Sequence, residues 1–180
     1  APMLHMIRPG VAEAIEAFVK AGGILVTTYL AGMVNEIDLA FLGGFPGPLR
    51  KLLGIWVEET DALWDQQTTD VVSTAGNPLG LTGRYAAKDI CDLLHLDGAE
   101  ALATYGSEFY QGMPAVTRHK VGKGWAYYIA SRNDERFLDD FTASIVRQAE
   151  LAPVLDAQVP AGVRMTRRTP RNGAIRLITL

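Results

Sequence analysis

Three histidines and one cysteine are the side chains in this sequence best suited to metal binding or nucleophilic catalysis. His5, His95 and His119 do not follow the H-E-x-x-H pattern or a comparable ligand spacing, so we expect surface or packing roles for them. Cys91 lies in an apolar run beside Asp92, and a nearby carboxylate raises the pKa of a thiol and lowers its reactivity. We therefore predict no metal site, no cysteine nucleophile and a buried structural role for Cys91.

Adjacent acidic residues are the next candidates for catalysis. They occur at Glu58-Glu59, Asp134-Glu135 and Asp139-Asp140. The two carboxyl groups of a glycosidase face one sugar about 5 to 9.5 Å apart, whereas adjacent residues on a strand or helix point in different directions. The sequence also lacks G-x-S-x-G, P-loop and G-x-G-x-x-G motifs. We predict no catalytic residue, no cofactor-binding residue and no cofactor in this chain.

The composition is that of an ordinary globular domain. Hydrophobic residues make up 48% of the 180 residues and charged residues 21%, and the net charge is −3. There is no overall basic field to attract nucleic acid, and no apolar run approaches the ~20 residues of a membrane span. A single cysteine fits a reducing compartment. We expect no nucleic-acid partner, no membrane partner and a cytoplasmic location.

Glycine, proline and apolar spacing predict the elements of the first half. Pro9-Gly10 precedes a pattern of apolar residues at helical spacing, and Gly22-Gly23 ends it. The β-branched run 24–29 is typical of a strand covered on both faces. A helix that leads into such a strand suggests an α/β sheet with crossovers. Residues 60–84 are expected to form a connection with one or two short strands.

The second half of the chain is rich in strand patterns. Successive strands are expected in "RYAAKDICDLLHL", "AEALATY" and "PAVTRHKVGKGWAYYIA", the last of which contains a hairpin turn at 121–124 followed by a buried strand. Asn133 or Asp134 is expected to cap a helix over 135–150 whose apolar stripe includes Phe137, Leu138 and Phe141. A short helix is expected in "PGPLRKLLG", ended by Gly54, and a further β-hairpin after Pro160.

Three segments closely resemble one family. They are "FVKAGGILVTTYLAGMVNEIDLAFLGGFPGPLRKLLGIWVEETDAL", "GAEALATYGSEFYQGMPAVTRHKVGKGWAYYIAS" and the helix that follows the second. They resemble the middle, trimerisation domain of the β-galactosidases of glycoside hydrolase family 42, over about residues 3–152. The resemblance implies a three-layer α/β/α fold with a mostly parallel sheet, like that of flavodoxin and the class I glutamine amidotransferases.

The resemblance also implies a domain plan. Residues 1–157 would be the trimerisation domain, with its first strand truncated, and residues 158–180 the linker and first hairpin of a C-terminal β-domain. A catalytic barrel carrying both catalytic glutamates would precede residue 1. The chain would then be a non-catalytic assembly domain of an enzyme that hydrolyses terminal β-D-galactosides. Its partners would be two further copies of itself, in a homotrimer, and its own barrel.

The glycine-rich segment 43–59 is the candidate contact region of such a domain. Phe45 and Pro46 in a loop flanked by glycines would make a rigid apolar projection, and arginines such as Arg50 are favoured at interfaces. The alternative is that Phe45 and Leu49 pack inward and the glycines only permit tight turns.

The loop after the first strand is a second candidate contact region. Its polar residues Asn35, Glu36 and Asp38 are candidate rim contacts toward the barrel. The alternative, which the residue types favour, is an ordinary solvated loop.

Two other functions are alternatives. The first is a small-molecule enzyme of amidotransferase or flavodoxin type. The resemblance to class I glutamine amidotransferases implies a nucleophilic cysteine after the strand 24–29 and a histidine after the strand 125–130, but residues 28–32 contain no cysteine and residues 131–134 contain no histidine. A carbohydrate-binding module would need exposed aromatic side chains. Trp56, Trp64 and Trp125 lie near apolar strand positions, so we expect them to be buried.

Overall fold

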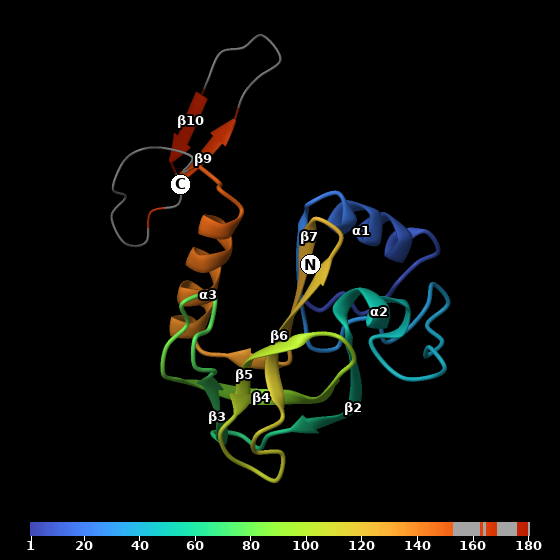
Figure 1. Cartoon of the computed structure of the whole chain (residues 1–180), viewed down its shortest axis with the longest axis vertical. Helices are drawn as coiled ribbons and strands as arrows, with labels where there is room; N and C mark the ends of the chain where they lie inside the picture. The colour runs from blue at the N-terminus through green and yellow to red at the C-terminus, as the bar shows by residue number, and fades with distance from the viewer. Residues whose placement is uncertain (153–162, 164, 169–175, 180) are drawn as a thin grey trace. The chain divides into compact units, whose positions relative to one another are not determined.

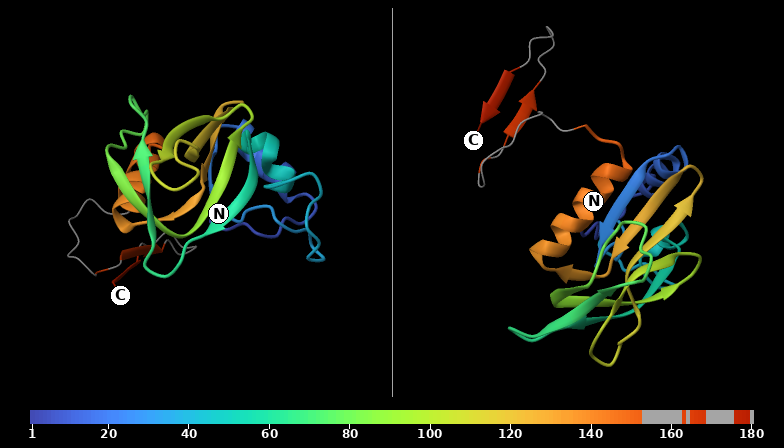
Figure 2. Two further views of the ribbon diagram at one scale, coloured as in Figure 1. Left: turned by 90° about the horizontal axis from the view of Figure 1, so that it is seen from below. Right: turned by 60° about the vertical axis from the view of Figure 1, so that its left-hand side comes forward.

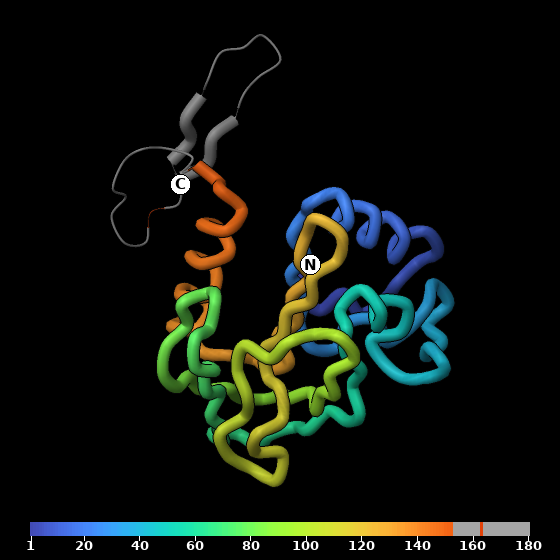
Figure 3. Tube along the Cα trace, in the orientation of Figure 1, coloured from blue at the N-terminus to red at the C-terminus, as the bar shows by residue number. Residues whose placement is uncertain are grey.

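The computed structural model describes residues 1–152, 163, 165–168 and 176–179 (Figures 1 and 3). The chain divides into two compact units, Ala1–Ile145 and Val146–Leu180, and the first contains nearly all of the described elements. Among the described residues, no helix is long and apolar enough to cross a membrane.

The first helix and strand form where the sequence predicts them. Helix α1 spans Val11–Lys20 and follows Gly10, whose φ of 82° lies in the left-handed region that glycine adopts without strain. Strand β1, Ile24–Thr28, follows after Gly22-Gly23. Its residues alternate between half-buried and buried, so the prediction of a strand fully covered on both faces is wrong.

Most of the chain forms one large sheet. Its other strands are β2 (Ile55–Ala62), β3 (Thr68–Ser73), β4 (Arg84–Leu96), β5 (Glu100–Tyr105), β6 (Pro114–Val121), β7 (Gly124–Ile129) and β8 (Ser131–Asn133). The order is β1-β7-β6-β5-β3-β4-β2, and β8 pairs with β4. Residues 60–84 therefore contribute the end of β2 and all of β3 to the sheet.

The predicted three-layer α/β/α fold with a mostly parallel, flavodoxin-like or amidotransferase-like sheet is wrong. Only β1 and β7 pair in parallel, and every other strand pair of the large sheet is antiparallel. The physical reason lies in the connections. Parallel neighbours need a crossover of a dozen or more residues, but the paired strands β5 and β6 are joined by residues 106–113, and the paired strands β6 and β7 by residues 122–123. Such short turns make neighbouring strands antiparallel.

The sheet curls back on itself through the segment that continues from β7. Strand β7 pairs with β6, and after Ala130 the chain enters β8, which pairs with β4. The Asp92 amide of β4 also donates to the Ala130 carbonyl at 2.8 Å. The two views of Figure 2 show the strong curvature of the strands. The interior is filled by large side chains, among them Tyr105, Tyr127, Tyr128 and Leu94.

Segments without regular secondary structure lie beside both outer strands of the sheet, β1 and β2. At β1, the Met3 amide donates to Thr28 Oγ1 at 2.9 Å, and Thr27 Oγ1 donates to the Ala1 carbonyl at 2.8 Å. At β2, Val57 forms an isolated bridge with Phe45 and donates its amide to the Phe45 carbonyl at 2.9 Å.

Helix α3, Glu135–Gln148, is capped by Asp134. One carboxylate oxygen of Asp134 accepts from the Phe137 amide at 2.8 Å, and the other accepts from the Ala86 amide of β4 at 3.0 Å. Phe137 and Phe141 are buried as predicted, whereas Leu138 is 47% exposed. The cap therefore ties the start of the helix to the sheet.

The second unit contains two strands. Strand β9 (Met165–Arg168) pairs in antiparallel register with β10 (Arg176–Thr179), in agreement with the hairpin predicted after Pro160. The predicted linker 153–160 and the turn between these strands lie outside the described residues. The domain limits at 157 and 158, and the assignment of the hairpin to a C-terminal β-domain, stay predictions.

Candidate functional site

The glycine-rich segment 43–59 forms a loop, a short helix and a strand. A 3-10 turn, η1 (Gly47–Leu49), leads into α2 (Arg50–Leu53), and Gly54 ends the helix with a left-handed φ of 63°. The predicted short helix and its glycine stop are confirmed. Leu49, Leu52 and Leu53 are buried, so the helix is anchored to the core by its apolar side chains. Strand β2 follows directly.

Two glycines in this region permit close contact between backbone segments. A Cβ at Gly32 would lie 2.2 Å from the Pro46 carbonyl oxygen, and one at Gly54 would lie 2.7 Å from the Ala99 nitrogen. At Gly43, by contrast, a Cβ would meet nothing within 4 Å. The loop after β1 and the loop before α2 are therefore held together by a contact that only a glycine allows.

Phe45 and Pro46 lie mainly inward. Pro46 is buried, and Phe45 is half-buried against the hydrophobic core. Leu49 is also fully buried. The inward-packing alternative raised from the sequence thus describes these side chains, although whether Phe45 or Pro46 also contacts another chain stays a prediction.

The exposed apolar residues of this region lie in the loop just before the glycine-rich segment. Ile37, Leu39 and Leu42 are 67%, 59% and 99% exposed. We call these three residues the loop surface. Asn35 shapes this turn, because its Oδ1 accepts from the amides of Ile37 at 3.1 Å and Leu39 at 3.0 Å.

Sequence reasoning selected the polar neighbours of the loop surface and missed its apolar residues. Glu36 and Asp38 are exposed and alternate with Ile37 and Leu39. These apolar residues could have been found from the sequence, because they stand between turn residues and belong to no helical or strand periodicity.

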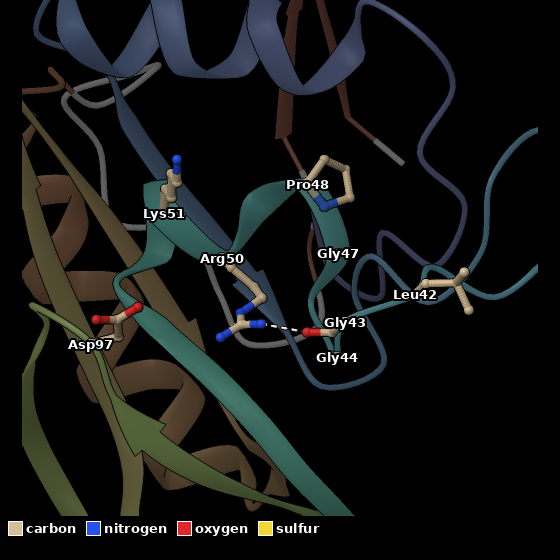
Figure 4. A pocket seen from close by; sticks show the side chains of 8 residues that line it. All are labelled: Leu42, Gly43, Gly44, Gly47, Pro48, Arg50, Lys51 and Asp97. Carbon is tan, nitrogen blue, oxygen red and sulfur yellow. Dashed lines mark hydrogen bonds between the residues drawn. The ribbon is translucent and has the colours of Figure 1, made fainter.

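A surface pocket lies beside the loop surface (Figure 4). Its volume is about 440 Å³, and its lining consists of Leu42, Pro48, three glycines (Gly43, Gly44, Gly47) and the charged residues Arg50, Lys51 and Asp97. Figure 4 shows the Arg50 side chain turned toward the Gly43 carbonyl, to which it donates a hydrogen bond. The predicted contact residue Arg50 therefore stabilises the loop and contributes positive charge to the pocket.

The tryptophans differ in exposure, and the prediction that all three are buried is wrong for Trp64. Trp64 is 84% exposed. Trp56 is half-buried and stacks on His95 with ring centroids 4.2 Å apart. Trp125 is half-buried, with the Arg118 guanidinium 4.4 Å from its ring centroid.

Trp64 and Phe109 lie on neighbouring loops. Phe109 is 76% exposed. Gln67 connects the loops: its amide and side-chain oxygen bond with the backbone of Trp64, and its Nε2 donates to Glu108 Oε1 at 3.4 Å. We call Trp64, Phe109 and the exposed acids Asp65 and Glu108 the aromatic surface.

The histidines have packing or surface positions. His119 Nδ1 lies 3.0 Å from the Leu52 carbonyl oxygen, and its ring packs beneath Gly54 and Gly98. His95 Nε2 lies 2.5 Å from Glu58 Oε2, and His5 is exposed. Within residues 1–152 and the described part of the tail, no three His, Cys, Asp or Glu residues gather as a metal site would require.

A buried carboxylate, Asp92 of β4, lies beneath the turn that follows β1. Its Oδ2 accepts from Tyr128 Oη at 2.6 Å and from the Leu30 amide at 3.3 Å, and its Oδ1 accepts from Thr60 Oγ1 at 2.7 Å. Asp92 is 1% exposed, and burial raises its pKa while these hydrogen bonds oppose the rise. Because the carboxylate is sealed and its oxygens are occupied, it stabilises the fold and is inaccessible to a substrate.

Cys91 is buried, as the sequence predicted. Burial is the largest cause that raises the pKa of its thiol to about 11, and Asp61 and Asp92 add to the rise. Leu30, in the turn after β1, has a left-handed φ of 58°.

The chain belongs to the β-galactosidase trimerisation domain family, whose profile matches residues 1–152. The family resemblance drawn from the sequence is thereby confirmed. The chain is a trimerisation domain of the family 42 β-galactosidases, and its similarity to them covers nearly all the described residues.

Individual relatives support this assignment. β-Galactosidase BglY of Alicyclobacillus acidocaldarius is 54% identical over 163 residues, which are 91% of this chain and 24% of that protein. The crystal structure of a β-galactosidase from Rahnella sp. R3 is 54% identical and superposes with a TM-score of 0.89, covering 93% of this chain and 25% of that one. The crystal structure of the β-galactosidase from Bacillus circulans sp. alkalophilus is 42% identical and superposes with a TM-score of 0.91, covering 98% of this chain and 26% of that one. The chain thus spans about a quarter of the length of these relatives.

Proposed function

We propose that this chain holds the subunits of a β-galactosidase together as a homotrimer and contributes no catalytic group. The observation that carries the proposal is the match of the trimerisation family to residues 1–152. The exposed apolar loops of the first unit support it, because exposed apolar groups with polar surroundings are typical of protein contacts.

Hydrolysis of terminal β-D-galactosides by the parent enzyme would use residues outside these 180. Support comes from the coverage of only about a quarter of each relative and from the acids described here. The buried Asp92 is occupied by three donors. The other partners of the domain would be the catalytic barrel of its own chain and two further copies of itself, in the cytoplasm.

The contact region of this assembly would include the loop 35–50. Of the residues predicted from sequence, Asn35 would hold the loop in shape, Glu36 and Asp38 would form a polar rim, and Arg50 would stabilise the glycines. Phe45 and Pro46 would anchor the loop from below, and Ile37, Leu39 and Leu42 would supply the apolar contact.

Light scattering of the 180-residue chain across a concentration series tests the proposal. We expect a mass that rises toward three times the 19.5 kDa of one chain. A mass of one chain at every concentration would overturn assembly by this domain. A parallel assay with a chromogenic β-galactoside is expected to show no hydrolysis, and turnover by the pure chain would overturn the non-catalytic role.

A further inference from the structure

A closed trimer requires two different surfaces on every copy. In a ring of three, each copy contacts the next in a head-to-tail manner, so one surface meets a second surface that differs from it. The first unit contains two groups of exposed apolar loop residues, the loop surface and the aromatic surface. Figures 1 and 2 show their segments apart: residues 35–42 lie beyond α2, and the β2–β3 turn and β5–β6 loop lie at the far part of the sheet.

The aromatic surface is held in a fixed shape before any contact forms. Besides the Gln67 bonds to Trp64 and Glu108, Thr69 Oγ1 lies 2.8 Å from Ser107 Oγ, and the Asp70 amide donates to Ser107 Oγ at 3.2 Å. Both loops are therefore tied to strand β3. Ordering of loops lowers affinity when it must occur on binding, so a preformed surface favours association.

The size and the charge of the pocket beside Leu42 suit the aromatic surface. Pockets of about 300–1,000 Å³ accept whole ligands, so the depression of about 440 Å³ has room for one aromatic side chain. Two cations, Arg50 and Lys51, and one acid, Asp97, give it a net positive charge. The acids Asp65 and Glu108 beside Trp64 carry the opposite charge.

We propose that Trp64 and Phe109 of one copy pack against Leu42 and its pocket on the next copy, with Asp65 and Glu108 facing Arg50 and Lys51. This inference rests on the proposed trimer and names its two complementary surfaces. A contact of the aromatic surface with itself would place four carboxylates together, and like charges at a contact are unfavourable. A head-to-tail contact avoids this and is the kind of contact from which a ring of three copies is built.

Cysteine cross-linking tests the pairing in the full 180-residue chain. The single variants Leu42→Cys and Trp64→Cys and the double variant are treated with a short bis-maleimide. We expect no covalent product from either single variant, a covalent dimer when the two are co-expressed, and covalent dimers and trimers from the double variant. Co-expression excludes a link within one copy.

Two controls make the readout specific. The unmodified chain should not react, because Cys91 is buried and the raised pKa keeps its thiol protonated. Leu138→Cys is a matched exposed site on α3, and its co-expression with Trp64→Cys should give no dimer.

The outcomes separate this inference from the proposed function. A trimer by light scattering without the cross-link between the two surfaces overturns the inference and leaves the assembly role standing. Dimers from Trp64→Cys alone also overturn it, because they show a symmetric contact. A single-chain mass together with no cross-link overturns both.

Discussion

The glycine-rich segment 43–59 and the hydrogen-bonded groups around Asp92 differ in which side chains they bury and which they expose. At residues 43–54, backbone segments meet through glycines, and the apolar side chains Leu49, Leu52 and Leu53 fix a loop that carries exposed apolar residues. Around Asp92, polar and ionisable groups are buried and satisfy one another. In this domain the buried ionisable side chains have structural roles, and the exposed apolar side chains are the candidates for function.

Replacement of the buried acid is the largest expected perturbation. Asp92→Ala would leave the Tyr128 hydroxyl, the Thr60 hydroxyl and the Leu30 amide without their acceptor. Each unsatisfied buried group costs about 1–3 kcal/mol, so we expect the free energy of unfolding to fall by about 3 kcal/mol or more. Denaturant unfolding measures this loss. Asp65→Ala, at an exposed acid, should stay within about 0.5 kcal/mol, and an equal loss in both variants would refute a special role for Asp92.

The glycine contact is expected to be the next most sensitive feature. Gly32→Ala places an alanine in the left-handed backbone conformation, which costs about 1–2 kcal/mol. It also brings the added Cβ against the Pro46 carbonyl. We expect a loss of at least about 2 kcal/mol in denaturant unfolding. Gly43→Ala is the matched control, because it has a similar positive φ of 90° and open space around it. Similar losses at both positions would show that the backbone contact is unimportant.

Truncation of the aromatic surface should weaken assembly and leave folding intact. We expect Trp64→Ala to raise the trimer dissociation constant at least about tenfold, since buried aromatic contacts at interfaces exceed about 1.4 kcal/mol. Its free energy of unfolding, measured under conditions where the chain is monomeric, should change by less than about 0.5 kcal/mol. Sedimentation over a concentration series measures the first quantity. Unchanged assembly would separate this surface from the interface.

The pH dependence of the Asp92 contribution is the smallest expected effect. The folded pKa of Asp92 lies above its ordinary value of about 4. The folded state therefore binds more protons than the unfolded state between the two pKa values, and this stabilisation is present below the unfolded pKa and lost as pH rises through the folded one. The unfolding free energy of the natural chain minus that of Asp92→Asn should fall from pH 4 upward. A difference that rises with pH would contradict the burial of this charge.

Local features of the fold were predictable from particular residues. Gly22-Gly23 and Gly54 marked the ends of α1 and α2, and the apolar run around Cys91, with Asp92 beside it, correctly indicated a buried thiol with a raised pKa. The antiparallel type of the sheet was not predicted, although the hairpin turn at 122–123 already required β6 and β7 to be antiparallel. The resemblance to a parallel fold outweighed that local evidence.

The candidate site was only partly predictable for a different reason. Periodicity identifies apolar residues that face a core, and it has no means to detect ones that face solvent from a loop. Leu42 and Phe109 are such residues, and Trp64 was expected to be buried because it follows a strand. The pairing of Asp92 with Tyr128 joins residues 36 positions apart, which spacing along the chain does not reveal.

The occupied flanks of β1 and β2 limit how copies of this domain can associate. An outer strand with free amides and carbonyls is a template for hydrogen-bonded pairing with another chain, which leads to open-ended aggregation. Here residues 1–3 accompany β1 and Phe45 accompanies β2. At these positions the chain's own residues cover the edges of β1 and β2, so contacts between copies there would use side chains and would not continue the sheet. Contacts of that kind would allow an assembly to stop at a definite number of subunits.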